Sequence, residues 1–584
     1  MRRLPFLAPL LLVPFFVAAA CGGSTVGTNV TADGSAPDST SPEGGPIPDP
    51  DVEEGPPKIK SANKVDVLLV VDNSASMSAK ADLLAKSLPA LAKQVTATGD
   101  VHLGVISSSL GSMGGDVCPE TGNTNMRAHL STRGENGTPL PSALKGFLTF
   151  AAGDSASAFT ADAQSLVRGM GQTGCGLEAQ LEATYRFLVQ PDPYVKVTLD
   201  QYNMARLDDV DSELLAQRAA FLRPDSLVLV LMVTDEDDSM PDPRALGGQG
   251  WAFAANKFPG STIFRADGQT TTAPRASSTC ATNPADPDCS SCGFAATCNP
   301  SEPSCQKLKA DPECQKNQGY WGPSEDQLNV RFHRMKERFG IDPQYPVTRY
   351  AYGFTRSRVP SVLQEHVEKE SSDGLKRREI GPYGEATPTC VNPLFAAKLP
   401  TGVAGDELCN LEFGTRGRDL VIFGLIGGVP QNLVAGTPDW TKILGASPES
   451  FDLTGIDPHM IQSTKPRAGL PGNAPLGDNG TDPVHGRDWD TKNDDLQFAC
   501  TFVLPEPHAC SPQDPSCDCA RGATPPLCSN ATTQVRGKAY PTIRELRVAK
   551  ALGDRAVVGS ICEGASYDGF VTRLATQLAP RLSF

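Results

Sequence analysis

Basic residues are scarce in this sequence: 52 lysines and arginines stand against 67 aspartates and glutamates, and the formal net charge is −15. Proteins that bind nucleic acid need a basic face to neutralise phosphates, so this balance argues against DNA or RNA as a partner. It favours solubility and the binding of cations, although a solvated acidic surface explains the same charge.

The familiar catalytic signatures are also missing. Only seven histidines occur, they are scattered, and neither HExxH nor G-x-S-x-G is present. No nucleophile can therefore be matched with a base. Gly169, Gly171 and Gly174 spell GxGxxG, but the preceding "ADAQSLVR" predicts a helix and not the strand that a dinucleotide site requires. The sequence offers no argument for an enzyme.

Long apolar runs are absent after the first 20 residues, so nothing later in the chain predicts a membrane-spanning helix. The N-terminus reads as an export signal, with Arg2 and Arg3 before a short apolar stretch from Leu4 to Val17. Small residues then precede Cys21, an arrangement that resembles a bacterial lipobox. Ordinary signal cleavage without lipidation is the alternative.

The segment after Cys21 supports lipidation. Residues 22–62 are rich in Gly, Ser, Pro, Thr and Asp and hold too few apolar residues to pack, which is typical of a disordered tether. A tether is most useful when its start is anchored. We therefore expect an exported protein of the cell envelope, held through a lipid on Cys21 at the outer membrane or the cell surface.

Cysteines, by contrast, are plentiful. There are 17, and setting Cys21 aside leaves an even number in a compartment where disulfides persist. Two clusters, Cys289–Cys314 and Cys510–Cys528, are typical of stapled loops without a core of their own. The first cluster has one CxxC where a zinc ribbon needs two, so zinc is the weaker interpretation. The disulfide connectivity cannot be deduced from the sequence.

Apolar strands alternate with helical patterns along the chain. Buried strands are predicted at Val65–Val71, Val101–Ser107, Leu227–Val233, Thr348–Phe354, Leu420–Ile426 and Ala556–Ile561. Helices are predicted at Met77–Val95, Leu177–Val189, Ser212–Leu222, Gln327–Phe339 and Gly569–Leu582. This alternation predicts an α/β fold with a doubly wound, mostly parallel sheet, interrupted by loop-rich, disulfide-stapled insertions.

Oxygen-bearing side chains follow two of these strands directly. Asp72, Ser74 and Ser76 come after the first strand in the spacing D-x-S-x-S, and Asp235 opens four consecutive carboxylates after the strand that ends at Val233. Ligands of such sheets bind at the carboxyl ends of the strands. Hydroxyl and carboxylate oxygens suit Mg²⁺, Mn²⁺ or Ca²⁺. The alternatives are a serine-rich turn that caps the next helix and a solvated acidic loop.

"DVLLVVDNSASM" and, far downstream, "LVLVLMVTDED" together resemble a von Willebrand factor A (VWA) domain with a metal-ion-dependent adhesion site, or MIDAS. Asp72, Ser74 and Ser76 match the first motif of that family. Thr234 and Asp235 match its later T-D-G-like turn, with a glutamate in place of the glycine. The whole pattern is similar to that of exported bacterial VWA lipoproteins and implies a VWA or Rossmann-like sheet.

The family also supplies a threonine from a loop before the third helix, here within "GMGQTGCGLEAQLEA". The spacing puts Cys175 in the threonine position, and Thr173 is a chemically suitable neighbour that we expect to contribute directly or through water. We further expect a disulfide between Cys118 and Cys175, the only cysteines between the first strand and Asp235. Both lie in loops at the same edge of the predicted sheet, and export favours their pairing.

The resemblance is good over residues 63–240 and scattered beyond them. It implies a division into a signal peptide 1–20, a tether 21–62, an N-terminal VWA part with the metal site 63–238, a Cys-rich insertion 239–325, a VWA-like helix and strand 326–355, an insertion 356–417, a core strand 418–430, a Cys-rich insertion 431–540 and a closing strand and helix 541–584.

The function that the resemblance implies is non-enzymatic binding or adhesion. A divalent cation, Mg²⁺ or else Mn²⁺ or Ca²⁺, would bridge the protein to an acidic residue of a partner protein whose identity the sequence does not reveal. The expected ligands are Asp72, Ser74, Ser76, Thr173 and Asp235. A metal-dependent envelope enzyme is one alternative, and a structural envelope protein whose metal stabilises the fold is another.

Overall fold

The computed structural model describes residues 54–583, so Cys21 and nearly all of the tether lie outside the described residues. Within that range the description omits residues 112–116, 119–121, 201–203, 249, 255–273, 284–285, 287, 297, 322–324, 326–329, 340–341, 371–377, 385–387, 404, 447–452, 473–481, 492–494, 512–513, 515 and 520–525.

Helices and strands alternate along much of the described chain. The strands are β1 Val65–Val71, β2 Asp100–Ser107, β3 Phe147–Ala151, β4 Lys196–Leu199, β5 Ala205–Asp208, β6 Leu227–Val233, β7 Arg358–Val359, β8 His366–Glu370, β9 Arg378–Tyr383, β10 Cys390–Val391, β11 Val421–Gly427, β12 Cys500–Ala509, β13 Cys528–Asn530, β14 Thr533–Ala539 and β15 Ala556–Ser560. The α-helices are α1 Ser78–Val95, α2 Ala156–Gly169, α3 Gln180–Leu188, α4 Ser212–Phe221, α5 Ala245–Gly248, α6 Pro303–Ala310, α7 Pro312–Gln315, α8 Arg331–Phe339, α9 Val347–Gly353, α10 Val362–Glu365, α11 Trp440–Leu444, α12 Ile543–Leu552 and α13 Asp568–Leu578.

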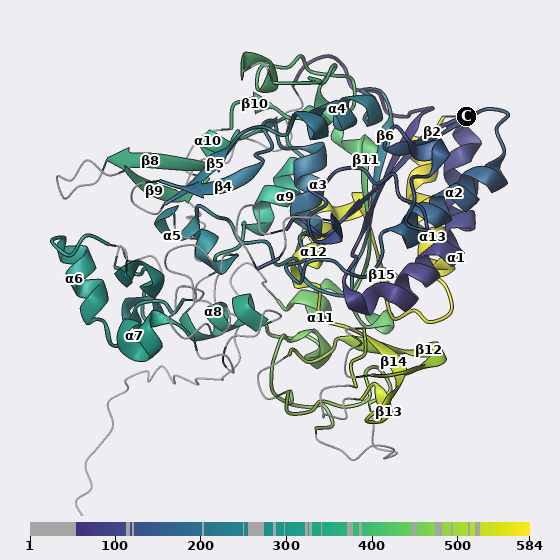
Figure 1. Ribbon diagram of the computed structural model, residues 1–584. Helices are drawn as coiled ribbons and strands as arrows, with labels where there is room; N and C mark the ends of the chain where they lie inside the picture. Colours follow the sequence, from purple (N-terminus) through teal and green to yellow (C-terminus); the bar gives the residue numbers. More distant parts are fainter. Residues whose placement is uncertain are drawn as a thin grey trace, which may run out of the picture.

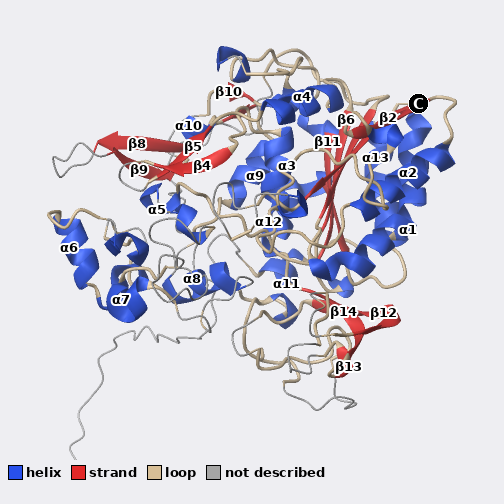
Figure 2. Ribbon diagram, viewed as in Figure 1, coloured by secondary structure: helices blue, strands red, loops and turns tan. Residues whose placement is uncertain are grey.

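A six-stranded sheet forms the centre of the fold, in the order β15-β11-β6-β1-β2-β3 (Figure 2). Its strands run parallel except for β3, which pairs antiparallel with β2 at one edge. Strands β1, β6 and β11 are buried along their whole length. That burial explains their continuous apolar sequences, because a parallel sheet is covered on both faces. The predicted mostly parallel α/β sheet is therefore present.

Alternate side chains of the sheet enter two separate cores, as the period of a strand requires. In β1, Leu68 and Val70 face one core, which includes residues of α3, α4, α9 and α12. Val67 and Leu69 face the other core, with residues of α1, α2 and α13. Figure 1 shows these two groups of helices on opposite faces of the sheet. The strands thus have no solvent-facing side at the centre of the molecule.

One predicted strand is wrong. The segment Thr348–Phe354 belongs to helix α9, Val347–Gly353, and not to the sheet. A short apolar run cannot distinguish a buried strand from a buried helix, and here Val347, Tyr350 and Ala351 recur at helical spacing on the buried side. The sixth strand is β3 instead, a short edge strand that the sequence analysis did not identify.

The expected insertions contain small elements outside the sheet. Segment 239–325 holds α5, α6 and α7, and segment 356–417 holds the β8–β9 and β7–β10 pairs. Segment 431–540 holds α11 and a three-stranded sheet in the order β12-β14-β13. In the described part of the chain, no helix is both long and apolar enough to cross a membrane.

Eight disulfides take up all 16 cysteines that follow Cys21. They join Cys118–Cys175, Cys280–Cys289, Cys292–Cys314, Cys298–Cys305, Cys390–Cys409, Cys500–Cys562, Cys510–Cys517 and Cys519–Cys528. Most close short loops inside the insertions. So much pairing is typical of an exported protein in an oxidising compartment.

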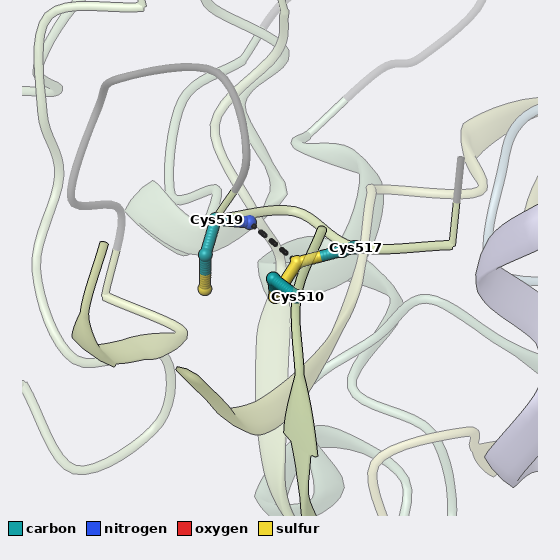
Figure 3. Close-up of side chains that lie close together, drawn as sticks. All are labelled: Cys510, Cys517 and Cys519. Carbon is teal, nitrogen blue, oxygen red and sulfur yellow. Dashed lines mark hydrogen bonds between the residues drawn. A yellow bond between two sulfur atoms is a disulfide. The ribbon is translucent and has the colours of Figure 1, made fainter. Parts of the chain in front are cut away.

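Three sulfur atoms meet near β12 without forming a metal site. Figure 3 shows Cys510 and Cys517 joined through their sulfur atoms, while the backbone N–H of Cys519 donates a 3.3 Å hydrogen bond to the Cys517 sulfur. Cys519 is itself bonded to Cys528. Because every sulfur of the group is in a disulfide, no thiolate is left to bind zinc.

A buried ion network connects α3 and α9 on one face of the sheet. Arg349 donates to Glu182 through Nε and Nη2, at 3.2 and 3.1 Å, and also contacts Glu365. Its guanidinium lies 3.9 Å from the ring centre of Tyr185. Burial raises the pKa of Glu182 although Arg349 lowers it, so the carboxylate depends on this arginine for its charge.

Replacing Arg349 by Met should lower the free energy of unfolding by about 3–5 kcal/mol, because two carboxylates would stay buried without a counter-charge. Urea unfolding under non-reducing conditions measures the loss. The control is Lys64→Met, which removes a half-exposed ion pair to Asp225 and should cost less than about 1 kcal/mol. Equal small losses for both variants would contradict the proposed role of the network.

Candidate functional site

The predicted site residues meet at the carboxyl edge of the central sheet. Strands β1 and β6 are parallel neighbours, and their last residues, Val71 and Val233, are paired directly. The backbone N–H of Asp72 donates a 3.0 Å hydrogen bond to the carbonyl of Val233. The turns after the two strands are therefore locked together, which brings Asp72 close to Thr234 although 162 residues separate them.

Asp72 is buried and held by three donors. Its Oδ1 accepts hydrogen bonds from the backbone N–H of Ser74 at 2.8 Å and from the hydroxyl of Ser108 at 3.3 Å. Its Oδ2 accepts from the hydroxyl of Thr234 at 3.0 Å. Ser108 follows β2, so three neighbouring strands fix the position of this one carboxylate.

Asp235 bonds directly to Ser76, which lies beside Ser74. The hydroxyl of Ser76 donates to Asp235 Oδ2 at 2.8 Å and lies 3.3 Å from the hydroxyl of Ser74. Asp235 is fully buried, and its other oxygen, Oδ1, has no hydrogen-bond partner within the described residues. A buried carboxylate oxygen without a partner is costly, and a cation would satisfy it.

A residue that the sequence analysis missed also occupies this site. The ammonium of Lys80 forms an ion pair with Asp235 Oδ2 and donates a 3.0 Å hydrogen bond to the carbonyl of Ser76. Both charged side chains are buried, with exposures of 1% for Lys80 and 0% for Asp235. The sequence carried only a partial signal, because Lys80 follows Ser76 by four residues, a spacing at which helical residues share a face, but its contact with Asp235 is tertiary.

The carboxylates around the site raise one another's pKa. Burial, and then the charge of Asp235, raise the pKa of Asp72 to about 6, although hydrogen bonds from Ser74 and Thr234 lower it. Burial raises the pKa of Glu236 to about 8, with Lys538 opposing the shift.

Burial and the charge of Glu236 hold the pKa of Glu178 well above its usual range. Burial therefore favours the neutral form of both glutamates. Lys80 supplies one positive charge against the carboxylates of Asp72 and Asp235, which leaves room for more positive charge.

The four consecutive carboxylates do not form a solvated loop. Asp237 accepts a 2.8 Å hydrogen bond from the backbone N–H of Arg544 in the first turn of α12. Asp238 accepts one of 3.0 Å from the backbone N–H of Leu181 in the first turn of α3. Negative charge is favourable at a helix N-terminus, so Asp237 and Asp238 position helices, whereas Asp235 enters the site.

The loop expected to supply a threonine is packed beside the site. The disulfide between Cys118 and Cys175 is present, so Cys175 has no free sulfur to offer as a ligand. Gly174 donates a 2.9 Å hydrogen bond to the carbonyl of Asn73, and a side chain at position 174 would clash with that residue.

Thr173 itself is exposed, and its hydroxyl accepts a 2.9 Å hydrogen bond from Asn123. No hydrogen bond among the described residues joins Thr173 to Asp72 or Asp235.

The donor set at this edge fits a hard divalent cation. Two carboxylates and two hydroxyls converge, and Asp235 Oδ1 is free to ligate. The ammonium of Lys80 already supplies one positive charge, so an ion would have to displace it or share Asp235 with it. The arrangement contains no histidine or thiol, which would favour a softer metal.

No protein-family model matches this chain, and the comparisons with curated proteins and with solved structures find no match either.

Replacing Lys80 by Met should lower the free energy of unfolding by about 3–5 kcal/mol in EDTA, because Asp235 would remain buried and unpaired. The double variant Lys80→Met/Asp235→Asn should recover much of this loss, since position 235 then carries no unpaired charge. Urea unfolding of the wild type, of each single variant and of the double variant gives the coupling energy. Full stability of the single variant would show that the pair contributes nothing.

Proposed function

We propose that this protein is a non-enzymatic binding protein of the cell envelope, which engages a partner protein through a divalent cation in a VWA-type MIDAS. The observation that carries the proposal is the meeting of Asp72, Ser74, Ser76 and Asp235 at adjacent strand ends, with an unpartnered oxygen on Asp235. These groups come from segments far apart in the chain, and a helix cap alone would not require the second carboxylate.

The arrangement of the sheet supports a doubly wound VWA-like fold. A mostly parallel sheet has helices on both faces and one antiparallel strand at its edge (Figure 1). The site lies outside the carboxyl ends of β1 and β6, where such sheets bind their ligands. The chain returns to the sheet through β11 and β15 after long insertions, as the resemblance implies.

Asp72, Ser74, Ser76 and Asp235 would hold Mg²⁺, or else Mn²⁺ or Ca²⁺, with Thr173 reached through water. When bound, the ion would supply an electrophilic position that accepts a carboxylate from the partner. The raised pKa values of Glu178 and Glu236 support this chemistry, because charged carboxylates at these positions would repel an acidic partner.

Lys80 gives the site a built-in competitor for the metal. Its ammonium neutralises Asp235 when no ion is bound, so the empty site does not leave two carboxylates unbalanced. A metal ion then has to displace the lysine or share Asp235 with it, and either cost is subtracted from the metal affinity. Binding of the bare ion is expected to be modest and to strengthen with partner present, because coupling between two ligands is reciprocal.

A structural role is the second candidate, and the burial of Lys80 favours it. An ammonium that stays on Asp235 permanently would make the site an ion pair that stabilises the fold, with no metal at all. The two candidates differ in what removal of Lys80 does to cation binding. A metal-dependent envelope enzyme stays a further alternative.

Isothermal titration of Mg²⁺, Mn²⁺ and Ca²⁺ distinguishes the candidates. Wild-type protein should bind one ion weakly, Asp72→Ala should lose binding, and Lys80→Met should bind roughly tenfold tighter or more because its competitor is gone. Lys93→Met, an exposed change on the same helix, is the matched control and should behave as wild type. Unchanged affinity in Asp72→Ala and Lys80→Met would favour the structural role.

Partner binding should depend on the same ion. Immobilised protein should retain a partner from envelope extract in Mg²⁺ and release it in EDTA, whereas immobilised Asp72→Ala should retain nothing above background. Asp72 is required because its carboxylate would help to hold the ion. Retention that survives both EDTA and the Asp72→Ala change would place the partner surface elsewhere.

The proposed location is the cell envelope, with a lipid on Cys21 as anchor at the outer membrane or cell surface. The eight disulfides support an oxidising, exported environment. The anchor rests on the sequence around Cys21 and on the tether that follows it.

Cys21→Ser should move the mature protein from the membrane fraction to the soluble fraction, because the residue that carries the lipid is lost. Cell fractionation followed by immunoblotting measures this shift. Cys118→Ser, which breaks a structural disulfide without touching the anchor, serves as the control and should remain with the membrane. Membrane association of Cys21→Ser at wild-type levels would refute lipidation.

A further inference from the structure

A second group of possible metal ligands lies far along the chain, in the loop-rich segment between β11 and β12. His459 belongs to a short 3₁₀ turn, Pro458–Met460, and Asp482 and His485 belong to a later turn. One ligand atom from each of these three residues lies within 4.8 Å of the other two. The two imidazole rings stand nearly perpendicular, with their centres 4.8 Å apart.

Two nitrogens face a single carboxylate oxygen. His459 Nε2 lies 3.1 Å from Asp482 Oδ1, and His485 Nδ1 lies 3.4 Å from the same atom. Neither nitrogen has an aligned hydrogen-bond partner among the described residues. Zn–N bonds of about 2.0–2.1 Å at tetrahedral angles place ligand atoms roughly 3.3 Å apart, so both distances suit a shared zinc ion.

The opposite nitrogens of both rings are held by carboxylates. His459 Nδ1 lies 2.6 Å from Asp457 Oδ1, and His485 Nε2 lies 2.6 Å from Asp488 Oδ1. A carboxylate behind each ring fixes its N–H on the far side and turns a lone pair toward Asp482. Metal-binding histidines are usually oriented by partners of this kind. Asp457 and Asp488 therefore support the assignment of the two histidines as metal ligands.

Arg467 holds the carboxylate of Asp488 in place. Its guanidinium donates two hydrogen bonds of 3.0 Å to Asp488, and a further one of 2.7 Å to the carbonyl of Phe498. Burial opposes the effect, but hydrogen bonds from His485 and Arg467 hold the pKa of Asp488 at about 2. The ring of His485 is fully buried and cannot turn toward solvent.

The charges of the group call for a divalent cation. Asp457, Asp482 and Asp488 carry three negative charges, and Arg467 returns only one. One Zn²⁺ bound to the two imidazoles would offset this negative charge.

We propose that His459, Asp482 and His485 bind one Zn²⁺ ion, with a water molecule in the fourth position on the partly exposed Asp482 side. This site is independent of the hard-cation site at Asp72 and prefers a different metal, because imidazole nitrogen favours zinc over magnesium. The ion would join two turns of an insertion that lies outside the central sheet. Its role there is to stabilise that segment.

The full-length protein without its signal peptide, first treated with chelator, should bind one Zn²⁺ per chain in a titration against a chromophoric competitor. His459→Gln and His485→Gln should each weaken this binding at least tenfold, and Asp457→Asn, behind the ring, should weaken it by about 10–100-fold. His508→Gln, which alters an exposed histidine–carboxylate pair, is the matched control and should bind as wild type. Asp72→Ala should also bind Zn²⁺ normally, which separates this test from that of the proposed function.

Spectroscopy of the wild-type protein tests the proposal even if the variants do not fold. Co²⁺ bound to the wild-type protein should show the intense visible absorption of a tetrahedral site, and X-ray absorption of the Zn²⁺ form should show imidazole ligands and no sulfur. Absence of Zn²⁺ binding by the wild type would overturn the proposal. Wild-type affinity for Zn²⁺ in both histidine variants would also overturn it, as would sulfur atoms among the ligands of the ion.

Discussion

The parallel pairing of β1 with β6 is the constraint on which the candidate site depends. Val71 and Val233 are paired directly, so the residues that follow them emerge side by side at one edge of the sheet. A shift of one residue in this register would turn the apolar side chains of β1 to the wrong faces and separate Asp72 from Thr234. The two buried cores therefore stabilise the site geometry as well as the fold.

The pairing of buried carboxylates with buried cations is a second feature of the structure. The chain is acidic, yet buried carboxylates are matched by buried cations: Lys80 with Asp235, Arg349 with Glu182, and Arg544 near Asp238. Each pair is expensive to break, because removal of one partner leaves the other charged and dehydrated. At the Asp72 site and at the histidine group, the protein's own cations do not cancel the carboxylates completely, and these are the places where we infer a metal.

The two inferred metal sites differ in chemistry and in architecture. The first consists of hard oxygens on turns that follow sheet strands, and an ammonium competes there for one carboxylate. The second consists of imidazoles held by carboxylates in the loop-rich part of an insertion, ahead of β12. The first is suited to reversible binding at an edge, and the second to holding loops together, in the same way as the neighbouring disulfides.

The sequence by itself determined the buried strands β1, β6, β11 and β15, because unbroken apolar runs between polar turns leave little choice of structure. It also determined which residues follow those strands, and hence Asp72, Ser74, Ser76 and Asp235 as candidates. Only the tertiary structure decided that Thr348–Phe354 is helical, since a short apolar run is compatible with both a buried strand and a buried helix.

Only the tertiary structure, likewise, brought Lys80 onto Asp235 and gathered His459, Asp482 and His485 into one group. The local sequence records spacing within a turn or helix, but convergence of distant side chains depends on how the chain is packed. The same limit applies to the disulfides: 16 cysteines predict pairing, and the folded chain alone selects the partners.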